Sequence, residues 1–294
     1  RLELDLGNVR AALSWALAQD DLLAVARMSS ALRRFWHRRG HGTEGHTWLK
    51  IALDQRAALP MRILAKVLYS LGVLDWHQGF LAEAHACLVE SVTLWRAVGD
   101  VSGLAYTLSV LGRATDERGD HAGARRLLEE SQALFRQIDD RWGLALALFR
   151  LGFVRTMAGE PDAQAPLAES LRFFQATGDR WGIGLALYGL GVWAYTQEAF
   201  DLAGDRLEQA LAAQRETGDR WLTAVTLNVL GDVARCQRVY EQAESAYQES
   251  LALFSLCLLY TSDDAAERSS DDLGGRRISK KKTKKNKTQR RSRT

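Results

Sequence analysis

The stretch Leu187-Tyr188-Gly189-Leu190-Gly191 is one of five segments in which a leucine is followed, three residues later, by a Leu-Gly pair. The five pairs are Leu71-Gly72, Leu111-Gly112, Leu151-Gly152, Leu190-Gly191 and Leu230-Gly231. Their spacings are 40, 40, 39 and 40 residues. A fixed period of this size is typical of a solenoid, in which each unit buries its apolar face against its neighbours. The chain is therefore expected to be a tandem array that binds through a stacked surface.

Four of the units continue with a small residue twelve positions after the glycine, as at Ala203, and a second one seven positions later, as at Ala210. A large residue, as at Leu207, follows the first small residue by four positions. These helical spacings predict two antiparallel helices that cross closely at the small residues. Aspartates between units are expected to cap the helix that follows each of them. These aspartates are Asp100, Asp140, Asp179 and Asp219.

This pattern resembles the tetratricopeptide repeat, over residues 61–254. The resemblance implies an all-α, right-handed superhelical solenoid of antiparallel helix pairs. The period is longer than the usual ~34 residues, and the aromatic residue expected three positions after each glycine is missing. A HEAT-like array would also suit this period, but it does not explain the Leu-Gly and alanine registers. In the third unit, Pro161 and Pro166 predict a second helix that begins late, with Pro166 in its first turn.

The N-terminal segment, residues 1–58, is expected to hold an amphipathic helix and a degenerate repeat, with Arg33 in place of the glycine. The runs 1–17, 34–41 and 44–49 resemble the start of the repeat region in bacterial STAND-type ATPase regulators. That resemblance implies a sensor arm that holds an ATPase inactive until an inducer or partner binds. It also implies a nucleotide-binding module and a winged helix upstream of Arg1. Residues 59–254 then form five repeats.

Catalytic and nucleotide-binding motifs are missing from the sequence. It contains no G-x-x-x-x-G-K-[ST] loop to hold a triphosphate, and no H-E-x-x-H or G-x-S-x-G motif. We therefore expect no enzyme activity, no cofactor and no metal in this chain. The residues His37, His41 and His46 lack a matching ligand pattern, so a solvated turn is favoured over a metal site.

Composition points to a helical protein in the cytoplasm. Apolar residues make up 47% of the chain, yet no uncharged apolar run is long enough to span a membrane. The three cysteines, Cys87, Cys236 and Cys257, show no paired spacing, and no signal peptide opens the chain. We expect the first two to be free, buried thiols.

The C-terminal segment, residues 255–294, breaks the repeat pattern. It holds twelve Lys or Arg and five Asp or Glu, a net charge of +7, whereas residues 1–254 hold 27 and 31, a net charge of −4. The segment resembles translated sequencing-adapter sequence, which implies a disordered, non-native tail. The alternative is a basic arm that binds nucleic acid. Nucleic acid is not expected to bind the mildly acidic solenoid.

The functional surface is expected on the inner face of the superhelix, where the first helices of the repeats would place aromatic side chains and a few charges. Trp142, Trp181 and Trp221 are instead interpreted as wedges between neighbouring units, with a ligand ladder as the alternative. The groove would bind a protein or peptide partner, or a small effector. A scaffold without an ATPase remains the alternative function. By register, the groove residues are Tyr69, Trp76, His77, Tyr106, Arg113, Asp116, Phe149, Phe153, Tyr188, Tyr195, Asn228, Asp232 and Arg235.

Overall fold

The computed structural model describes residues 5–255, and every regular element within them is a helix. Before the repeats lie α1 (Leu6–Ala18), α2 (Leu22–Ala31), α3 (Arg33–Arg38), α4 (Gly42–Asp54) and the 3-10 helix η1 (Arg56–Ala58). The repeats comprise α5 (Met61–His77), α6 (Leu81–Val98), α7 (Val101–Glu117), α8 (His121–Gln137), α9 (Arg141–Met157), α10 (Gln164–Thr177), α11 (Arg180–Thr196), α12 (Phe200–Thr217) and α13 (Arg220–Cys236). Residues 240–255 are also helical and pair with α13.

The predicted all-α solenoid of antiparallel helix pairs is confirmed. Each Leu-Gly pair lies in the first helix of a unit, and the helix that follows packs against it. A Cβ atom added at Gly112 would lie 2.7 Å from Cγ of Leu128, the large residue of the second helix. Similar conflicts, at 2.5–2.7 Å, arise at the other four glycines. The glycine is therefore needed because a side chain of the second helix occupies the space of its Cβ.

The predicted aspartate caps are also confirmed. Oδ1 of Asp140 accepts a hydrogen bond of 2.8 Å from the backbone N–H of Gly143, which satisfies one of the free donors at the start of α9. The same contact, at 2.8–3.1 Å, opens three other first helices, from Gly103 to Asp100, Gly182 to Asp179 and Leu222 to Asp219. Each unit therefore begins at a defined residue.

A recurring serine joins the two helices of a unit by a hydrogen bond that the sequence reasoning missed. The buried hydroxyl of Ser131 in α8 donates to the carbonyl of Ala105 in α7 at 2.8 Å. Ser91, Ser170 and Ser250 make the same bond to Ala65, Ala145 and Ala224 at 2.7–2.8 Å. The sequence explained this position by size alone, but the hydroxyl also bridges the two helices.

The third unit has the late second helix that the sequence predicted. Its second helix, α10, begins only at Gln164, and Pro166 lies in the first turn, where its missing N–H needs no partner. Leu167 packs on Gly152 of α9, with its Cγ 2.6 Å from the position of an added Cβ. The late start therefore preserves the close helix contact of the other units.

The degenerate N-terminal unit exchanges the roles of its two helices. Its first helix is divided at Leu32 into α2 and α3, and the fully buried Trp36 of α3 donates from Nε1 to the carbonyl of Ser29 at 3.2 Å. A Cβ at Gly45 of α4 would lie 2.5 Å from Trp36. Here the glycine belongs to the second helix and the large residue to the first. Because the chain turns at Leu32, α3 takes a direction of its own.

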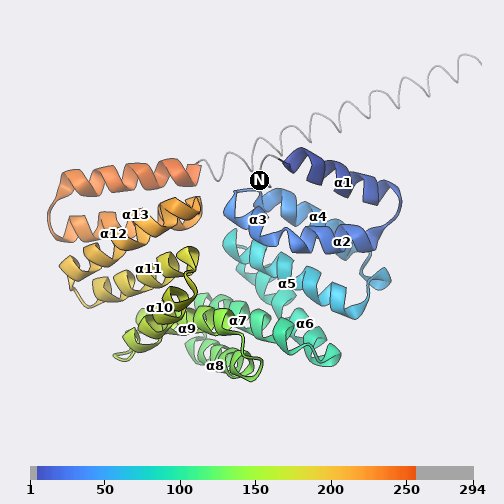
Figure 1. Cartoon of the computed structure of the whole chain (residues 1–294), viewed down its shortest axis with the longest axis horizontal. Coiled ribbons are helices and arrows are strands. Elements are labelled where there is room, and N and C mark those ends of the chain that lie inside the picture. Colours follow the sequence, from blue (N-terminus) through green and yellow to red (C-terminus); the bar gives the residue numbers. More distant parts are fainter. Residues whose placement is uncertain (1–4, 256–294) are drawn as a thin grey trace, which may run out of the picture.

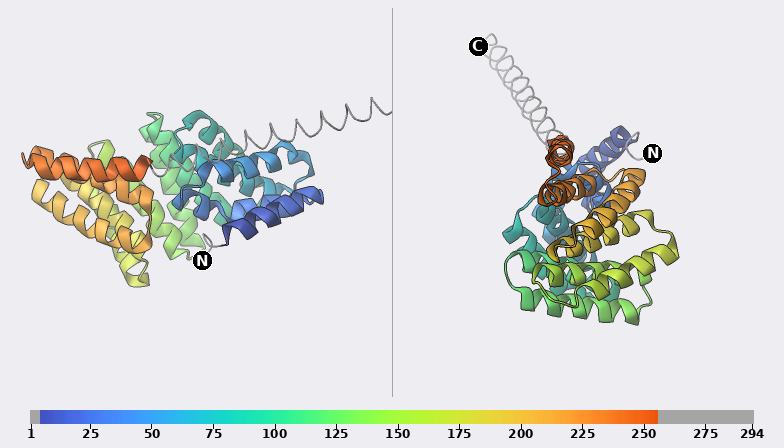
Figure 2. Two further views of the ribbon diagram at one scale, coloured as in Figure 1. Left: turned by 90° about the horizontal axis from the view of Figure 1, so that it is seen from above. Right: turned by 90° about the vertical axis from the view of Figure 1, so that its left-hand side faces the viewer.

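The helix pairs follow an arc that brings the first and last units together (Figure 1). The ring of His37 in α3 lies 5.9 Å, between centroids, from that of Trp221 in α13. The turned views of Figure 2 show the same succession of pairs from the N-terminal helices to the last helix. The concave side of the arc is therefore bounded by α3 as well as by the first helices of the repeats.

Two further expectations concern cysteines and membranes. Cys87 and Cys236 are free thiols but are only partly buried, which corrects the prediction of buried thiols; Cys257 lies outside the described residues. Burial raises the pKa of Cys87 to about 11.

Within residues 5–255, no helix combines the length and apolar character needed to cross a bilayer. Apart from Ser255, the predicted tail also lies outside the residues described.

Candidate functional site: an aromatic and cationic cavity

A cavity of about 290 Å³ lies on the inner face of the arc, between α3 and the first helices of the five repeats. It contains the middle part of the surface that the sequence predicted. Its walls include most of the predicted aromatic residues and one predicted arginine. These residues are Tyr69, Trp76, His77, Tyr106, Arg113, Phe149, Phe153 and Tyr188.

The other predicted groove residues lie elsewhere. Asp116 is buried behind the cavity wall and accepts hydrogen bonds from Arg113 and His121 at 3.0 and 2.7 Å. Tyr195 packs against Phe200 at the far end of α11, with ring centroids 6.0 Å apart. Asn228, Asp232 and Arg235 belong to α13 but do not line the cavity. The cavity is therefore shorter than the predicted strip.

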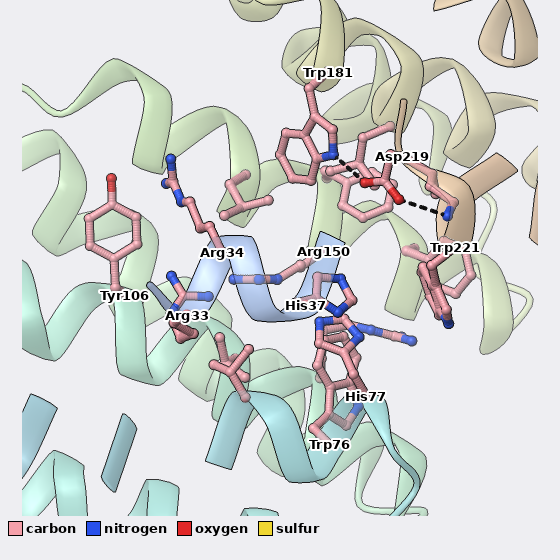
Figure 3. Close-up of a pocket in the computed structure, with 18 of the residues that line it drawn as sticks. Arg33, Arg34, His37, Trp76, His77, Tyr106, Arg150, Trp181, Asp219 and Trp221 are labelled. Atoms are coloured by element: carbon pink, nitrogen blue, oxygen red, sulfur yellow. Dashed lines mark hydrogen bonds between the residues drawn. The ribbon is translucent and has the colours of Figure 1, made fainter. Parts of the chain in front are cut away.

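The degenerate N-terminal unit contributes three cavity residues that sequence reasoning missed: Arg33, Arg34 and His37. In Figure 3 Arg33 lies beside Arg150 and His37 beside His77, while Arg34 extends toward the side of Tyr106. The substitution of Arg33 for the repeat glycine was visible in the sequence. The position of the Arg33 side chain in the cavity was not visible, because it depends on the break between α2 and α3 at Leu32.

Two of the tryptophans at the starts of the first helices contact the next unit, as the wedge interpretation expected, and all three also line the cavity. Nε1 of Trp142 donates to Oδ2 of Asp179 at 2.5 Å, and Nε1 of Trp181 donates to Oδ2 of Asp219 at 2.8 Å. Each indole thus binds the capping aspartate of the next unit. Trp142, Trp181 and Trp221 also line the cavity. The packing contact holds the ring faces in place around the open space.

Three arginines lie over aromatic faces of the cavity. The guanidinium carbon of Arg33 is 4.8 Å from the centroid of Tyr69, and that of Arg34 is 4.5 Å from Trp142. Arg113 lies 4.6 Å from the centroid of Phe153. Cation–π contact orients a guanidinium without neutralising its charge. Of these three, Arg113 also has carboxylate partners, Asp116 and Glu117, each at 3.0 Å.

Arg150 of α9 occupies a different environment. Its Nη1 donates to Oγ of Ser109 at 2.6 Å, and within residues 5–255 it forms no ion pair with a carboxylate. Burial lowers the pKa of Arg150 to about 10, with repulsion from the nearby Arg113 and Arg33 in the same direction. The guanidinium is still charged at neutral pH, so the cavity contains a charge that no carboxylate of residues 5–255 pairs with.

Two histidines stack at the edge of the cavity. The rings of His37 and His77 lie 3.6 Å apart between centroids. Burial holds the pKa of His77 well below its usual value, and charge repulsion from His37, Arg150 and Arg33 acts in the same direction. His77 is therefore neutral at pH 7.

The histidines singled out in the sequence do not share one environment. The predicted solvated turn is wrong for His41, which is 4% exposed and stacks on Phe35 with centroids 5.4 Å apart. His46 lies 3.1 Å from a carboxylate oxygen of Asp75 in α5. In the part of the chain described, no three His, Cys, Asp or Glu side chains gather in a group that could hold a metal ion.

Comparison with known proteins identifies the family of this chain. A family model described as tetratricopeptide repeat matches residues 63–137 and 182–255, just over half of the sequence. The chain belongs to the tetratricopeptide repeat family. The unmatched residues between the two segments include the third unit, whose second helix begins late at Gln164. A search of the curated proteins found no match.

Solved structures share the fold of this tetratricopeptide repeat chain at low sequence identity. A Rap protein complexed with competence and sporulation factor is 14% identical, with a TM-score of 0.69, over 89% of this chain and 78% of that one. BtubC (BKLC) from P. vanneervenii is 17% identical, with a TM-score of 0.52, over 78% and 91%. A STAND protein with a tetratricopeptide repeat sensor from Pyrococcus horikoshii is 14% identical, with a TM-score of 0.51, over 92% and 48%.

The polar groups of the cavity wall are largely occupied by contacts within the protein. Its acids already have partners: Asp219 caps α13 and accepts from Trp181, while Glu117 accepts from Trp76 at 2.8 Å. The tetratricopeptide repeats here provide ring faces and guanidinium groups around a concave space. These are features that bind and orient a ligand.

Proposed function

We propose that this chain is the effector-sensing and protein-interaction segment of a bacterial STAND-type signalling or transcription regulator, acting in the cytoplasm. In that role the repeats hold an ATPase inactive until a ligand or partner binds. The fold shared with a STAND protein that has a tetratricopeptide repeat sensor supports the proposal. So does the resemblance of the N-terminal residues to the start of the repeat region in such regulators.

The observation that most strongly supports the proposal is that the N-terminal unit approaches the later repeats across the cavity. Arg34 of α3 lies over Trp142 of α9, and His37 lies beside Trp221 of α13. A ligand in the cavity would touch the N-terminal unit and the repeats together. Its binding energy could therefore change the position of α3, the side on which an upstream ATPase would join.

The coding sequence upstream of Arg1 provides the first test. The proposal expects a G-x-x-x-x-G-K-[ST] loop followed by a winged helix in the same reading frame. ATP turnover would then be measured in the whole protein and in a version without the repeats. Faster turnover without the repeats would support the proposed inhibition. An upstream frame without a nucleotide-binding module would favour the alternative, a tetratricopeptide scaffold that works without an ATPase.

A second candidate function, nucleic-acid binding through residues 255–294, rests on their net charge of +7 alone. Such binding would weaken steeply with salt and disappear when the segment is removed. Related reading frames that continue in repeat register after Phe254 would argue against it.

A further inference from the structure

The charges around the cavity do not balance. Four arginines line it, Arg33, Arg34, Arg113 and Arg150, against two carboxylates, Asp219 and Glu117. Both carboxylates accept hydrogen bonds from tryptophan indoles, and Glu117 also pairs with Arg113. The lining therefore carries excess positive charge, although residues 1–254 as a whole are net negative.

Three of these arginines have no carboxylate partner within the described chain. Arg33 and Arg34 rest on the faces of Tyr69 and Trp142, and Arg150 bonds to a neutral hydroxyl, that of Ser109. Figure 3 shows the guanidinium groups of Arg33 and Arg150 next to each other, while the Arg34 side chain extends toward the side of Tyr106. Arg33 and Arg150 are partly buried, and taking a guanidinium out of water is costly unless a counter-charge replaces the lost hydration. A bound anion would supply that counter-charge.

We propose that the cavity binds a small organic anion, with its carboxylate or phosphate group on Arg33 and Arg150, Arg34 adding positive charge at the rim, and an apolar or aromatic body against the surrounding rings. Guanidinium groups recognise carboxylate and phosphate alike through paired N–H donors. Phe149, Phe153 and Tyr188 supply the apolar wall for the body of the ligand.

The size of the cavity favours a compact ligand over an extended peptide. Its volume of about 290 Å³ is at the lower end of the range for small-molecule sites, which begins near ~300 Å³. The approach of α3 to α13, with His37 beside Trp221, narrows the inner face along which a peptide would run. This assignment deepens the proposed sensing role, on which it rests, by naming the chemical class of the effector.

The anion would also connect the N-terminal unit to the middle of the arc. Arg33 and Arg34 belong to the degenerate N-terminal unit, whereas Arg150 belongs to the third repeat. Mutual repulsion among these guanidinium groups opposes their approach in the empty cavity, and a shared anion replaces it with attraction. Binding is therefore expected to draw α3 toward α9.

The test is a titration of the purified chain with four probes of similar size: benzoate, phenyl phosphate, benzyl alcohol and benzylamine. Binding is followed by calorimetry and by the fluorescence of the cavity tryptophans, in low-salt buffer free of phosphate. At least one of the two anions should bind about tenfold or more tightly than the neutral alcohol, and the amine should not bind detectably. The tighter anion identifies the source of charge as carboxylate or phosphate.

Variants connect the binding to the named residues. Arg150→Gln should weaken the preferred anion about tenfold or more, and Arg150→Lys should restore part of the loss. Arg126→Gln, on the exposed face of α8, is the matched control and should leave affinity unchanged. If Arg150→Gln fails to fold, Arg34→Gln serves instead, because the Arg34 side chain is exposed and its loss leaves the helix core intact.

Several outcomes would overturn the assignment. These are equal affinity for benzoate, phenyl phosphate and benzyl alcohol, no binding of either anion, or full affinity in a folded Arg150→Gln variant. Binding of an acidic hexapeptide without binding of either small anion would overturn the small-molecule class. The titration uses this chain alone, so its failure would leave the ATPase proposal standing. A missing upstream ATPase would likewise leave the anion site standing.

Discussion

The guanidinium carbon of Arg34 lies 4.5 Å from the centre of the Trp142 ring, and this contact joins the N-terminal unit to the third repeat across the inner face. The same indole donates to Asp179, the cap of the next first helix, and lies 6.1 Å from the ring of Trp181. One side chain thus connects the N-terminal unit, the third repeat and the fourth. The cavity wall and the contacts between repeats are made by the same residues.

Substitution of Gly152 by alanine should destabilise the fold. Its new Cβ would lie 2.6 Å from Cγ of Leu167 and 3.1 Å from the backbone nitrogen of that residue, so the two helices must move apart. We expect a cost of about 1–3 kcal/mol in the free energy of unfolding, measured with urea.

The control for this change is Gly204→Ala, within α12, where no atom lies within 4 Å of an added Cβ. That variant should gain about 0.5–1 kcal/mol from helix propensity. Equal effects of the two substitutions would show that α9 and α10 do not cross at Gly152.

Loss of one interhelix hydroxyl should have a smaller effect. Ser131→Ala removes the hydrogen bond to the carbonyl of Ala105 and leaves a buried space one oxygen atom in size. The expected cost is about 0.5–1.5 kcal/mol of unfolding free energy. Ser245→Ala, on an exposed helical position, is the control and should change stability by about 0.5 kcal/mol or less. A cost at Ser131 no larger than at Ser245 would mean that the hydroxyl contributes nothing.

Stability should fall as the pH drops below neutral, partly because of His77. Its pKa is depressed in the folded state, mainly by burial and further by His37, Arg150 and Arg33. The unfolded chain therefore takes up this proton first, near its ordinary pKa of about 6.5, and each further drop in pH favours unfolding until the lowered pKa is reached.

The measurement compares urea unfolding at about pH 7.5 and about pH 5.5 for the natural chain and for His77→Gln. Glutamine keeps a polar side chain of similar length but does not titrate, so the variant should lose less stability between the two pH values. If both proteins lost the same amount of stability between the two pH values, His77 would already be protonated in the folded state at the lower pH.

Ligand binding should depend on Phe153 and not on Tyr195. The sequence placed these two aromatics in one strip, but only Phe153 lines the cavity, where it stacks with Tyr188 at 5.9 Å and supports Arg113. With the anionic probe that binds best, Phe153→Ala should cost about 1–3 kcal/mol of binding free energy. Tyr195→Ala should leave affinity within about twofold.

Melting curves of the two variants must accompany that titration, since Phe153 also packs on its neighbours. A loss of affinity at Tyr195 as large as at Phe153 would place the binding surface along the whole of the predicted strip. A loss that merely followed the change in thermal stability would make Phe153 a packing residue.

Local sequence patterns were enough to predict the repeat and its helix boundaries. The Leu-Gly pairs, the alanines and the capping aspartates act within one unit or between neighbours, and helical periodicity is enough to place them. The late start of α10 at Gln164, with Pro166 in its first turn, and the aspartate caps follow from equally local rules. Even the substitution of Arg33 for a glycine marked the N-terminal unit as different before its structure was known.

The position of the cavity and the charges around it could not be predicted from the sequence, because they depend on the tertiary structure. The curvature of the arc accumulates over many small rotations between repeats, which no single motif encodes. It brings Arg33, Arg34 and His37 against residues of the third and fifth units and leaves Tyr195 and Asn228 outside. Likewise, the sequence shows that Arg150 is an arginine, but its hydrogen bond to Ser109 in place of a carboxylate of the described residues follows from how distant helices meet. Contacts of that kind depend on the whole chain, because each one requires every intervening unit to be in place.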